Sequence, residues 1–421
     1  MTSPAAPLAP SEADGLLLGA IMTDEGRQDP YGAYARLRSG SPRWRNGFGF
    51  TVLTTYQDCV EALRNPRLGR PEPDMELDGS IVGGPGRRRP EDGDEVAMLF
   101  LNPPDHTRIR GLVARAFTPR RVEELRPRIE ALLAPVLDQF ADQGGGDVVT
   151  DLAVPFPVAV ISELLGVPRE GNEFLEPLIH AGTRLIDAAL TEDERVVGQA
   201  AVAEVAAYFV ELAAEKRRRP DDRLFSALIE VEAEGDRLSE AELIGNTILL
   251  YAAGFETTSN LIGNGLRALL TAPDEMTRLR DDRSLLPSAV VEMLRFDSPV
   301  QLNVRAVLEP VDLFGTRWER GDLFVVLQGS GNRDGAVYDD PDRFDVGRFT
   351  VDAPTPLSFG WGAHHCLGAH LARAEGEIVF AALVDRFGAI DLDTTALGAT
   401  APRYRPSFTL RGLESLPVRV G

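Results

Sequence analysis

One stretch near the end of the chain decides the fold, Phe359-Gly360-Trp361-Gly362-Ala363-His364-His365-Cys366-Leu367-Gly368. Apolar residues then recur at three- and four-residue spacing, which predicts a helix that begins just after Cys366. The unpaired amides of a helix start carry partial positive charge and lower the pKa of a cysteine placed there. Gly362 and Gly368 permit backbone conformations and close approaches that a side chain would block. The stretch therefore favours a thiolate on a tight loop, presented to a flat or metallic group.

Three interpretations of Cys366 are open at this point. A buried structural thiol would leave the glycines and His364 unexplained. A zinc site would use Cys366, His364 and His370, with Cys366 and His370 four residues apart on a helix. A haem iron with an axial thiolate would use Cys366 alone, and such a ligand pushes electron density toward O–O cleavage.

The stretch resembles the haem-binding loop of the cytochrome P450 family, Phe-x-x-Gly-x-His/Arg-x-Cys-x-Gly. Its specified positions are filled by Phe359, Gly362, His364, Cys366 and Gly368. The resemblance implies that Cys366 binds the iron of haem b and that the fold is the family's single domain, mainly α with a small β region. We expect this haem domain over residues 29–421, after a flexible N-terminal tail over residues 1–28 whose beginning is rich in Pro, Ala and Ser.

A second motif is Glu292-x-x-Arg295, whose two side chains share one face of a predicted helix. By itself it indicates only a surface ion pair worth ~0.2–0.5 kcal/mol. The resemblance implies instead a buried network with Arg348, in the segment before the cysteine loop. Loss of one partner would then strand a buried charge at a cost of ~3–5 kcal/mol. We expect its role to be structural.

A third motif lies midway along a predicted helix, at Ala253-Gly254-Phe255-Glu256-Thr257-Thr258. Glycine followed by β-branched residues is poor helix material, and Thr257 can bond back to a carbonyl three or four residues earlier. The segment resembles the family's oxygen-activation motif, in which an acid and an alcohol face the distal side of the haem. This implies that Glu256 and Thr257 are catalytic and deliver protons to bound dioxygen.

Cationic side chains in three segments resemble the family's ligands of the haem propionates. His106 and Arg110 lie four residues apart on one helix face, Arg305 ends the segment Val300-Gln301-Leu302-Asn303-Val304-Arg305, and His364 belongs to the cysteine loop. Two carboxylates in a protein interior need compensating donors, and the planar arginine fork suits them.

Helical periodicity dominates the rest of the chain. We predict helices over residues 105–117, 121–143, 157–165, 192–218, 222–232, 240–270, 273–281, 285–296 and 367–387, and strands over 50–54, 304–309 and 323–328. A glycine- and proline-rich stretch over residues 71–95 predicts a long functional or mobile loop.

Composition restricts the partners and the compartment. The 421-residue chain has a formal net charge of −21 and a pI near 4.7, so we expect no nucleic acid and no membrane as partners. The early apolar stretch is too short to span a bilayer, and we expect a cytoplasmic protein. With only two cysteines, a disulfide in that compartment is not expected, and Cys59 is interpreted as a buried free thiol.

By resemblance the chain is a monooxygenase that inserts one oxygen atom from O2 into a lipophilic small molecule, in secondary metabolism. Electrons would come from a separate ferredoxin and ferredoxin reductase, since the sequence ends soon after the haem helix. A local basic patch near the cysteine loop would receive the acidic ferredoxin, with candidates Arg108, Arg115, Arg120 and Arg121. A hydrogen-peroxide-dependent peroxygenase and a non-catalytic haem sensor or carrier are the alternatives, and retention of both Glu256 and Thr257 argues against each.

Overall fold

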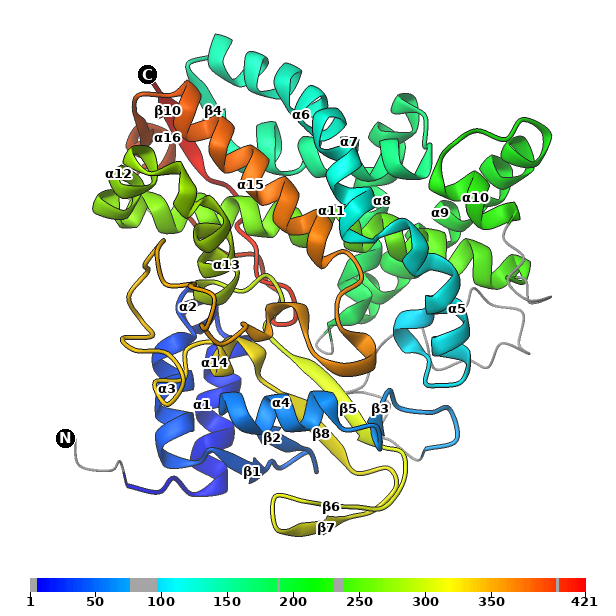
Figure 1. The fold of residues 1–421 in the computed structure, drawn as a ribbon. Helices are drawn as coiled ribbons and strands as arrows, with labels where there is room; N and C mark the ends of the chain where they lie inside the picture. Colours follow the sequence, from blue (N-terminus) through cyan, green and yellow to red (C-terminus); the bar gives the residue numbers. More distant parts are fainter. Residues whose placement is uncertain (1–5, 76–96, 188–189, 231–237, 399–400) are drawn as a thin grey trace.

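The computed structural model of the protein describes residues 6–75, 97–187, 190–230, 238–398 and 401–421. Helices make up most of this part of the chain, and the larger sheet lies at one side of them (Figure 1). The mainly helical single domain with a small β region that the sequence predicted is confirmed. The predicted loop over residues 71–95 lies largely outside the described residues, which stop at 75 and resume at 97.

The helix α11 (Glu240–Thr271) is the long central helix of the domain. Its start is a capping box in which Ser239 accepts a bond from the Glu242 amide and Glu242 accepts one from the Ser239 amide, at 3.2 and 2.8 Å. Large side chains such as Tyr251 and Phe255 are fully buried along it. The helices that pack most extensively against α11 are α7 (Pro155–Leu165), α9 (Glu192–Arg218), α13 (Leu286–Phe296) and α15 (Ala369–Arg386).

Further helices surround this bundle and carry the connections to the sheets. They are α4 (Tyr56–Arg64), α5 (Asp105–Val113), α6 (Pro119–Asp142), α8 (Arg169–Thr183), α10 (Leu224–Glu230), α12 (Pro273–Asp281), α14 (Gln328–Gly331) and α16 (Thr394–Leu397). The sequence analysis missed α8, because Gly171 and Pro177 make its sequence poor helix material. Packing overrides that propensity, since α8 buries Leu175 and Ile179.

The larger sheet has the strand order β1-β2-β8-β5-β3. Its strands are β1 (Arg43–Arg45), β2 (Thr51–Leu53), β8 (Leu323–Val326), β5 (Asn303–Val307) and β3 (Leu68–Gly69). The pair β2 and β8 is parallel, and the other neighbours are antiparallel. In the β3–β5 pair Gly69 lies opposite Ala306. This register brings Arg70 close to Arg305.

Two smaller sheets close the structure. One has the order β4-β10-β9 and joins β4 (Gly145–Asp147) and β9 (Ile390–Leu392) to the C-terminal strand β10 (Pro417–Val420). The other is the hairpin of β6 (Val311–Leu313) and β7 (Thr316–Trp318). The strands expected over 50–54, 304–309 and 323–328 correspond to β2, β5 and β8.

Residues 10–28 form helices where a flexible tail was expected. These are α1 (Pro10–Met22) and α2 (Asp24–Gln28), followed by α3 (Tyr31–Gly40). Leu17 of α1 is buried in a cluster with Tyr34 and Trp44, so hydrophobic burial holds this segment on the domain. The prediction of a flexible tail relied on the Pro- and Ala-rich composition at the chain start and overlooked the buried face of α1.

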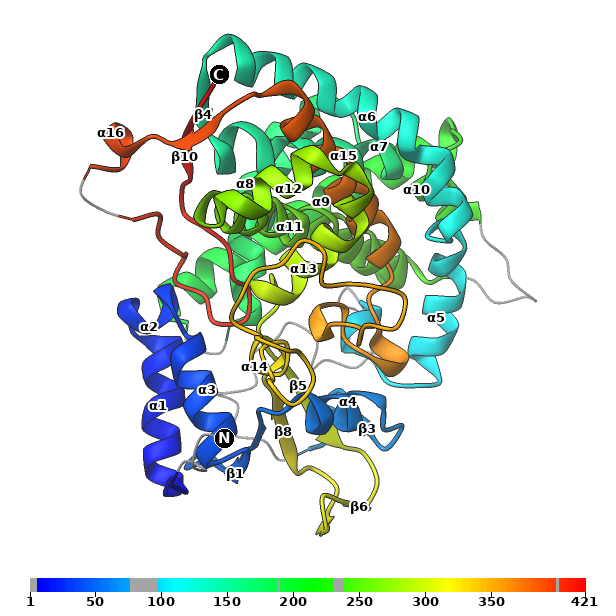
Figure 2. The ribbon, with the colours of Figure 1, turned by 60° about the vertical axis from the view of Figure 1, so that its left-hand side comes forward.

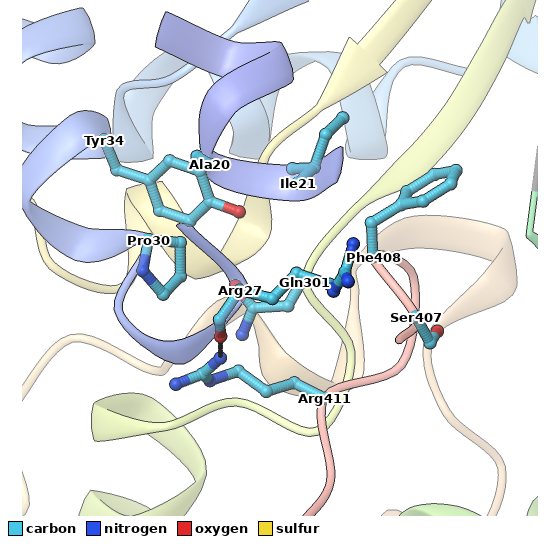
Figure 3. A pocket seen from close by; sticks show the side chains of 9 residues that line it. All are labelled: Ala20, Ile21, Arg27, Pro30, Tyr34, Gln301, Ser407, Phe408 and Arg411. Carbon is cyan, nitrogen blue, oxygen red and sulfur yellow. Dashed lines mark hydrogen bonds between the residues drawn. The ribbon is translucent and has the colours of Figure 1, made fainter. Parts of the chain in front are cut away.

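Hydrogen bonds from the C-terminal segment hold the same N-terminal helices in place. It runs beside α2 in Figure 2, and Arg411 donates hydrogen bonds to the carbonyl oxygens of Arg27 and Gln28. Figure 3 shows the small recess that remains between them, with Tyr34 and Gln301 on one side and Phe408 on the other. The buried carboxylate of Asp297 also pairs with Arg411, which ties this corner to the end of α13.

The helix α9 is long and apolar enough to cross a membrane, with a mean hydropathy of 1.5 over its most apolar window. It packs, however, against α8, α10 and α11. Phe209 and Leu212 are buried in the main core cluster. These contacts are those of a core helix in a globular domain.

Candidate functional site

The cysteine loop is closed by hydrogen bonds within its own backbone. The Cys366 amide donates to the carbonyl of Phe359 at 2.8 Å, and the His365 amide donates to the carbonyl of Gly362 at 3.1 Å. Gly362 has a φ of +72°, and a Cβ there would lie 2.4 Å from the Leu63 carbonyl oxygen. Only glycine satisfies both conditions. The predicted requirement for Gly362 therefore has a direct steric cause.

Gly368 differs from Gly362. It precedes α15 as the N-cap, with an ordinary negative φ of −82°. Among the described residues, no atom lies within 4 Å of a Cβ built there. The protein itself does not demand glycine at this position, so its contribution is open space beside the start of α15.

The Cys366 thiol is exposed, whereas the Cys59 thiol is buried with Sγ 3.6 Å from the carbonyl of Leu53. Protein atoms nevertheless crowd the recess around Cys366. This desolvation raises the pKa of the Cys366 thiol above its ordinary value, and the Gly368 amide, Arg110 and Arg373 only partly counter it. The expected lowering of the pKa by the helix start is therefore wrong for the free thiol. A thiolate here needs a cationic partner.

The expected propionate ligands converge from three elements. His106 and Arg110 lie on α5, Arg305 on β5 and His364 in the cysteine loop. The rings of His106 and His364 are 4.2 Å apart, and Arg110 donates to the carbonyl of His365 at 2.6 Å. Arg305 is 3% exposed, and its Nη1 donates to the Val304 carbonyl at 3.0 Å.

The described part of the chain supplies no anion to this cation cluster. No ion pair in the described ranges involves Arg110 or Arg305, and His106 Nδ1 and His364 Nε2 are buried without a hydrogen-bond partner there. Burial, reinforced by nearby arginines, lowers the pKa of His106 to about 4 and that of His364 to about 2. Burial also lowers the pKa of Arg305 far below its ordinary value. Groups that resist charging in this way take up a charge only beside an anionic ligand.

Arg70 is a further member of the cation cluster that sequence reasoning missed. Its positive charge contributes to the lowered pKa values of His106, His364 and Arg305. Its Nε is buried with no partner among the described residues. Because Gly69 of β3 lies opposite Ala306 of β5, the next residue Arg70 follows the strand toward Arg305. No local sequence motif signals this contact; only the register of the two strands produces it.

The residues present fit a haem group. The exposed Cys366 thiol supplies one soft ligand for iron. The neighbouring cation cluster supplies unused donors for two carboxylates, and space remains beside Gly368. The zinc interpretation loses its basis, because within the described residues no three His, Cys, Asp or Glu side chains are grouped to hold a metal ion.

On α11, Thr257 and Glu256 have different surroundings. Thr257 Oγ1 donates to the carbonyl of Ala253 at 3.0 Å, the back-bond that the sequence predicted. Ala253 is exposed although most of α11 is buried, so water-accessible space adjoins this turn. Thr257 therefore lies beside that space.

Glu256 is buried, with a side chain 7% exposed, and contacts two other elements. Its Oε1 lies 2.8 Å from Arg405 Nη2 in the C-terminal segment, and its Oε2 lies 3.3 Å from His180 Nδ1 on α8. Burial raises the pKa of Glu256, but His180 and Arg405 outweigh it and hold the pKa below its ordinary value. In this structure the Glu256 carboxylate is held between Arg405 and His180.

Glu292, Arg295 and Arg348 come together as the resemblance implied. Arg295 forms a bidentate pair with Glu292 at 2.7 and 2.8 Å, and both side chains are fully buried. Arg348 Nε donates to the same carboxylate at 3.1 Å. The remaining arginine donors reach backbone carbonyls of the segment before the cysteine loop, namely those of Asn332, Asp339, Asp340, Pro341 and Arg343. The network therefore braces that segment.

Known proteins share both this fold and this sequence pattern. Residues 85–396 match the family model described as Cytochrome P450. Cytochrome P450 107B1 of Saccharopolyspora erythraea is 41% identical over 403 residues, which cover 94% of this chain and 96% of that protein. The cytochrome P450 monooxygenase PikC of Streptomyces venezuelae is 38% identical over 415 residues, covering 96% and 93%. The crystal structure of P450BioI in complex with acyl carrier protein ligated to hexadec-9Z-enoic acid has a TM-score of 0.83 at 32% identity, covering 94% of this chain and 99% of that chain.

Proposed function

The chain belongs to the cytochrome P450 family and is a haem-dependent monooxygenase, and we propose that it inserts one atom of O2 into a C–H or C=C bond of a lipophilic small molecule in secondary metabolism. The observation that carries this proposal is the pairing of an exposed thiol at Cys366 with a buried cation cluster that has no anionic partner among the described residues. A structural thiol would need neither the exposure nor the unused donors.

Haem b is the proposed prosthetic group, and this chain's residues divide the task of holding it. Cys366 would bind the iron, while His106, Arg110, Arg305, His364 and Arg70 would bind the propionates. When bound, the haem supplies the iron at which O2 is activated. Phe359, whose carbonyl accepts the Cys366 amide, and Gly362 hold the loop that presents the thiolate, and Gly368 leaves room beside it.

Glu256 and Thr257 are the proposed proton donors. Thr257 lies beside the water-accessible turn of α11, and its hydroxyl can accept a proton from one neighbour while donating to another. Glu256 must leave Arg405 and His180 to bring a proton to that side, because its carboxylate is held between them. Glu292, Arg295 and Arg348 have a structural role in this proposal.

The proposed substrate is lipophilic. The turn of α11 beside the open space carries Leu249, Ala252 and Ala253, which are apolar and incompletely buried. Apolar walls of this kind favour polyketides, terpenoids, steroids or fatty acids. The related P450BioI structure holds a fatty acyl chain on its carrier protein.

Ferredoxin and a ferredoxin reductase are the proposed electron donors, in the cytoplasm. The expected basic patch is narrower than the sequence suggested. Arg108 pairs with Glu242, and Arg120 and Arg121 both approach Glu124, at 3.1 and 3.5 Å. Arg115 is exposed, and Arg64 lies over the ring of Trp361 in the cysteine loop, 4.2 Å from its centroid. These two arginines are the better candidates for contact with an acidic partner.

A turnover assay tests the proposal. Purified protein with ferredoxin, its reductase and NAD(P)H should oxidise a compound first found by a spectral binding screen of myristic acid, hexadec-9Z-enoic acid, testosterone and macrolactones. Thr257→Ala should keep the haem spectrum and substrate binding but divert electrons to hydrogen peroxide, although ordered water can partly replace the hydroxyl. Product formed with hydrogen peroxide alone, and none with NAD(P)H, would establish the peroxygenase instead. A haem spectrum without product under either condition would favour a sensor or carrier.

A further inference from the structure

The helix α9 is apolar on two opposite faces, and it lies beside α8 and α10, away from the larger sheet (Figure 1). One face packs on the core with Val205 and Phe209, which are buried. The opposite, outward face carries Val196, Val197 and Val210, which are 55%, 59% and 45% exposed. A surface helix normally has polar residues opposite its core face, and a helix that is apolar all round is normally covered on every side. The outward face of α9 has the composition of a buried face but is uncovered among the described residues.

The apolar residues along the middle of this outward face follow a regular spacing. They recur in alternate steps of four and three residues, and all of them are exposed: Val196, Ala200, Ala203, Ala207, Val210 and Ala214. At 3.6 residues per turn these positions fall within about 80° of the helix circumference, opposite the buried face. This alternation is the spacing at which one helix packs along another. Because the side chains are small, a partner helix can approach to an interaxial distance of about 8 Å.

The two ends of α9 carry opposite charges. Its first turn is acidic and its last turn is basic. Asp193 in the first turn and Arg218 in the last are both exposed, and neither has an ion-pair partner within the described ranges. Such charges favour the dipole of their own helix. They also make α9 complementary to a second α9 that runs antiparallel to it, because each acidic end then lies beside a basic end.

We propose that the outward face of α9 is the contact surface for a second copy of this chain, with the two α9 helices antiparallel about a two-fold axis. The axis lies level with Val205, midway along the helix, so Ala203 of one protomer faces Ala207 of the other. The same register places Asp193 of each protomer beside Arg218 of the other. Every contact occurs twice, because a two-fold interface uses the same surface on both protomers. This inference does not depend on the proposed function.

A second copy fits this face better than a membrane or an unrelated protein. Glu204 and Glu211 are exposed beside the apolar residues, and the chain has a formal net charge of −21. Carboxylates at this position oppose burial of the face among anionic lipids. An unrelated protein would have to supply both a small apolar face and the reversed order of charges. A second α9 supplies both by symmetry.

Analytical ultracentrifugation of the haem-loaded full chain tests the pairing. One helix face is small for a stable interface, so we expect a reversible dimer that forms between about 1 and 100 µM. Ala207→Glu introduces a charge at the centre of the contact and should weaken association at least about tenfold. The matched control Ala131→Glu introduces the same charge at an exposed position of α6 and should match wild type. The carbon monoxide spectrum shows whether each variant is folded around its haem.

Charge reversal at the two ends of α9 tests the antiparallel register. Asp193→Arg places like charges beside each other at both ends of the contact, and Arg218→Asp does the same. Each variant alone should therefore weaken dimerisation at least about threefold at low ionic strength, and less in high salt. The double variant exchanges the two charges and restores opposite charges at both ends. It should recover the association of the wild-type protein.

Four results would contradict the proposal. Wild-type protein that stays monomeric over the whole concentration range would overturn it. A dimer that Ala207→Glu leaves intact would be held by another surface, which would also overturn it. If the double charge variant did not recover association, the antiparallel register would be wrong. Monomeric protein that binds vesicles of phosphatidylcholine and phosphatidylglycerol, with binding lost in Ala207→Glu, would assign this face to a membrane instead.

Discussion

Two buried polar clusters of this protein both contain arginines, and they differ in whether the described residues also supply an anion. In the network of Glu292, Arg295 and Arg348, the carboxylate receives both guanidinium groups, and backbone carbonyls accept the remaining donors. In the cation cluster of Arg70, His106, Arg110, Arg305 and His364, buried nitrogens lack partners among the described residues, and pKa values fall far below ordinary ones. The first cluster is complete within the chain. The second has no anion from the described residues, and an anionic ligand would complete it.

The difference separates scaffold from binding site on physical grounds. A buried charge needs an opposite charge and hydrogen bonds, because removal from water costs several kcal/mol. Where the chain supplies both, the cluster stabilises the fold. Where the chain supplies only cations, the missing charge must belong to the ligand. The position of the second cluster beside an exposed cysteine then indicates the haem.

The largest expected effect is all-or-none and identifies the iron ligand beside the cation cluster. Cys366→Ser should abolish the red-shifted Soret band that reduced thiolate-ligated haem shows with carbon monoxide, because an alcohol does not replace the thiolate. Cys59→Ser is the matched control and should leave the band intact, since that thiol is buried elsewhere. Loss of the band in Cys59→Ser would show that the ligand is misassigned.

The next prediction removes the carboxylate from the network of Glu292, Arg295 and Arg348. Glu292→Ala strands Arg295, which is fully buried, and should cost ~3–5 kcal/mol of unfolding free energy together with most of the haem content. Denaturant unfolding and the haem-to-protein ratio measure both. The control Glu240→Ala removes the exposed pair with Arg217, which should cost less than about 1 kcal/mol. A stable, fully haem-loaded Glu292→Ala protein would contradict the buried-network interpretation.

A third prediction contrasts one arginine from each cluster. Arg305→Met removes a buried cation without an anionic partner, so the haem-free protein should gain ~1–2 kcal/mol of stability while haem is lost faster. Arg295→Met leaves Glu292 buried without its bidentate partner and should destabilise both forms. Melting temperatures with and without haem, and the rate of haem transfer to an acceptor protein, measure these effects. If Arg305→Met destabilised the haem-free protein, the two clusters would not differ as described.

The smallest expected effect concerns Arg70, which is less buried than Arg305. Arg70→Met should weaken haem retention by about 1 kcal/mol, a several-fold faster loss, with little change in the carbon monoxide spectrum. Its backbone bond to Asn102 does not depend on the side chain and is retained. Arg67→Met is the control, because Arg67 donates to the carbonyl of Pro310 outside the cluster. Equal haem loss in Arg70→Met and wild type would exclude Arg70 from the propionate site.

Most of the scaffold followed from local patterns. The capping box of Ser239 and Glu242, the back-bond of Thr257 and the pairing of Glu292 with Arg295 all involve residues within one or two helical turns. Such contacts depend on helix geometry alone, so spacing along the chain predicts them. The α8 helix escaped prediction because tertiary packing overrides its Gly171 and Pro177.

By itself the sequence determined the family, the loop that presents Cys366, and the residue types around it, because these are encoded in short spacings that resist coincidence. Only the tertiary structure decided that Arg70 joins the cation cluster, through the register of β3 against β5. It also decided that Glu256 is held by His180 and Arg405. These contacts join residues from about 75 to more than 230 positions apart, and their energies depend on burial and charge that no local pattern records.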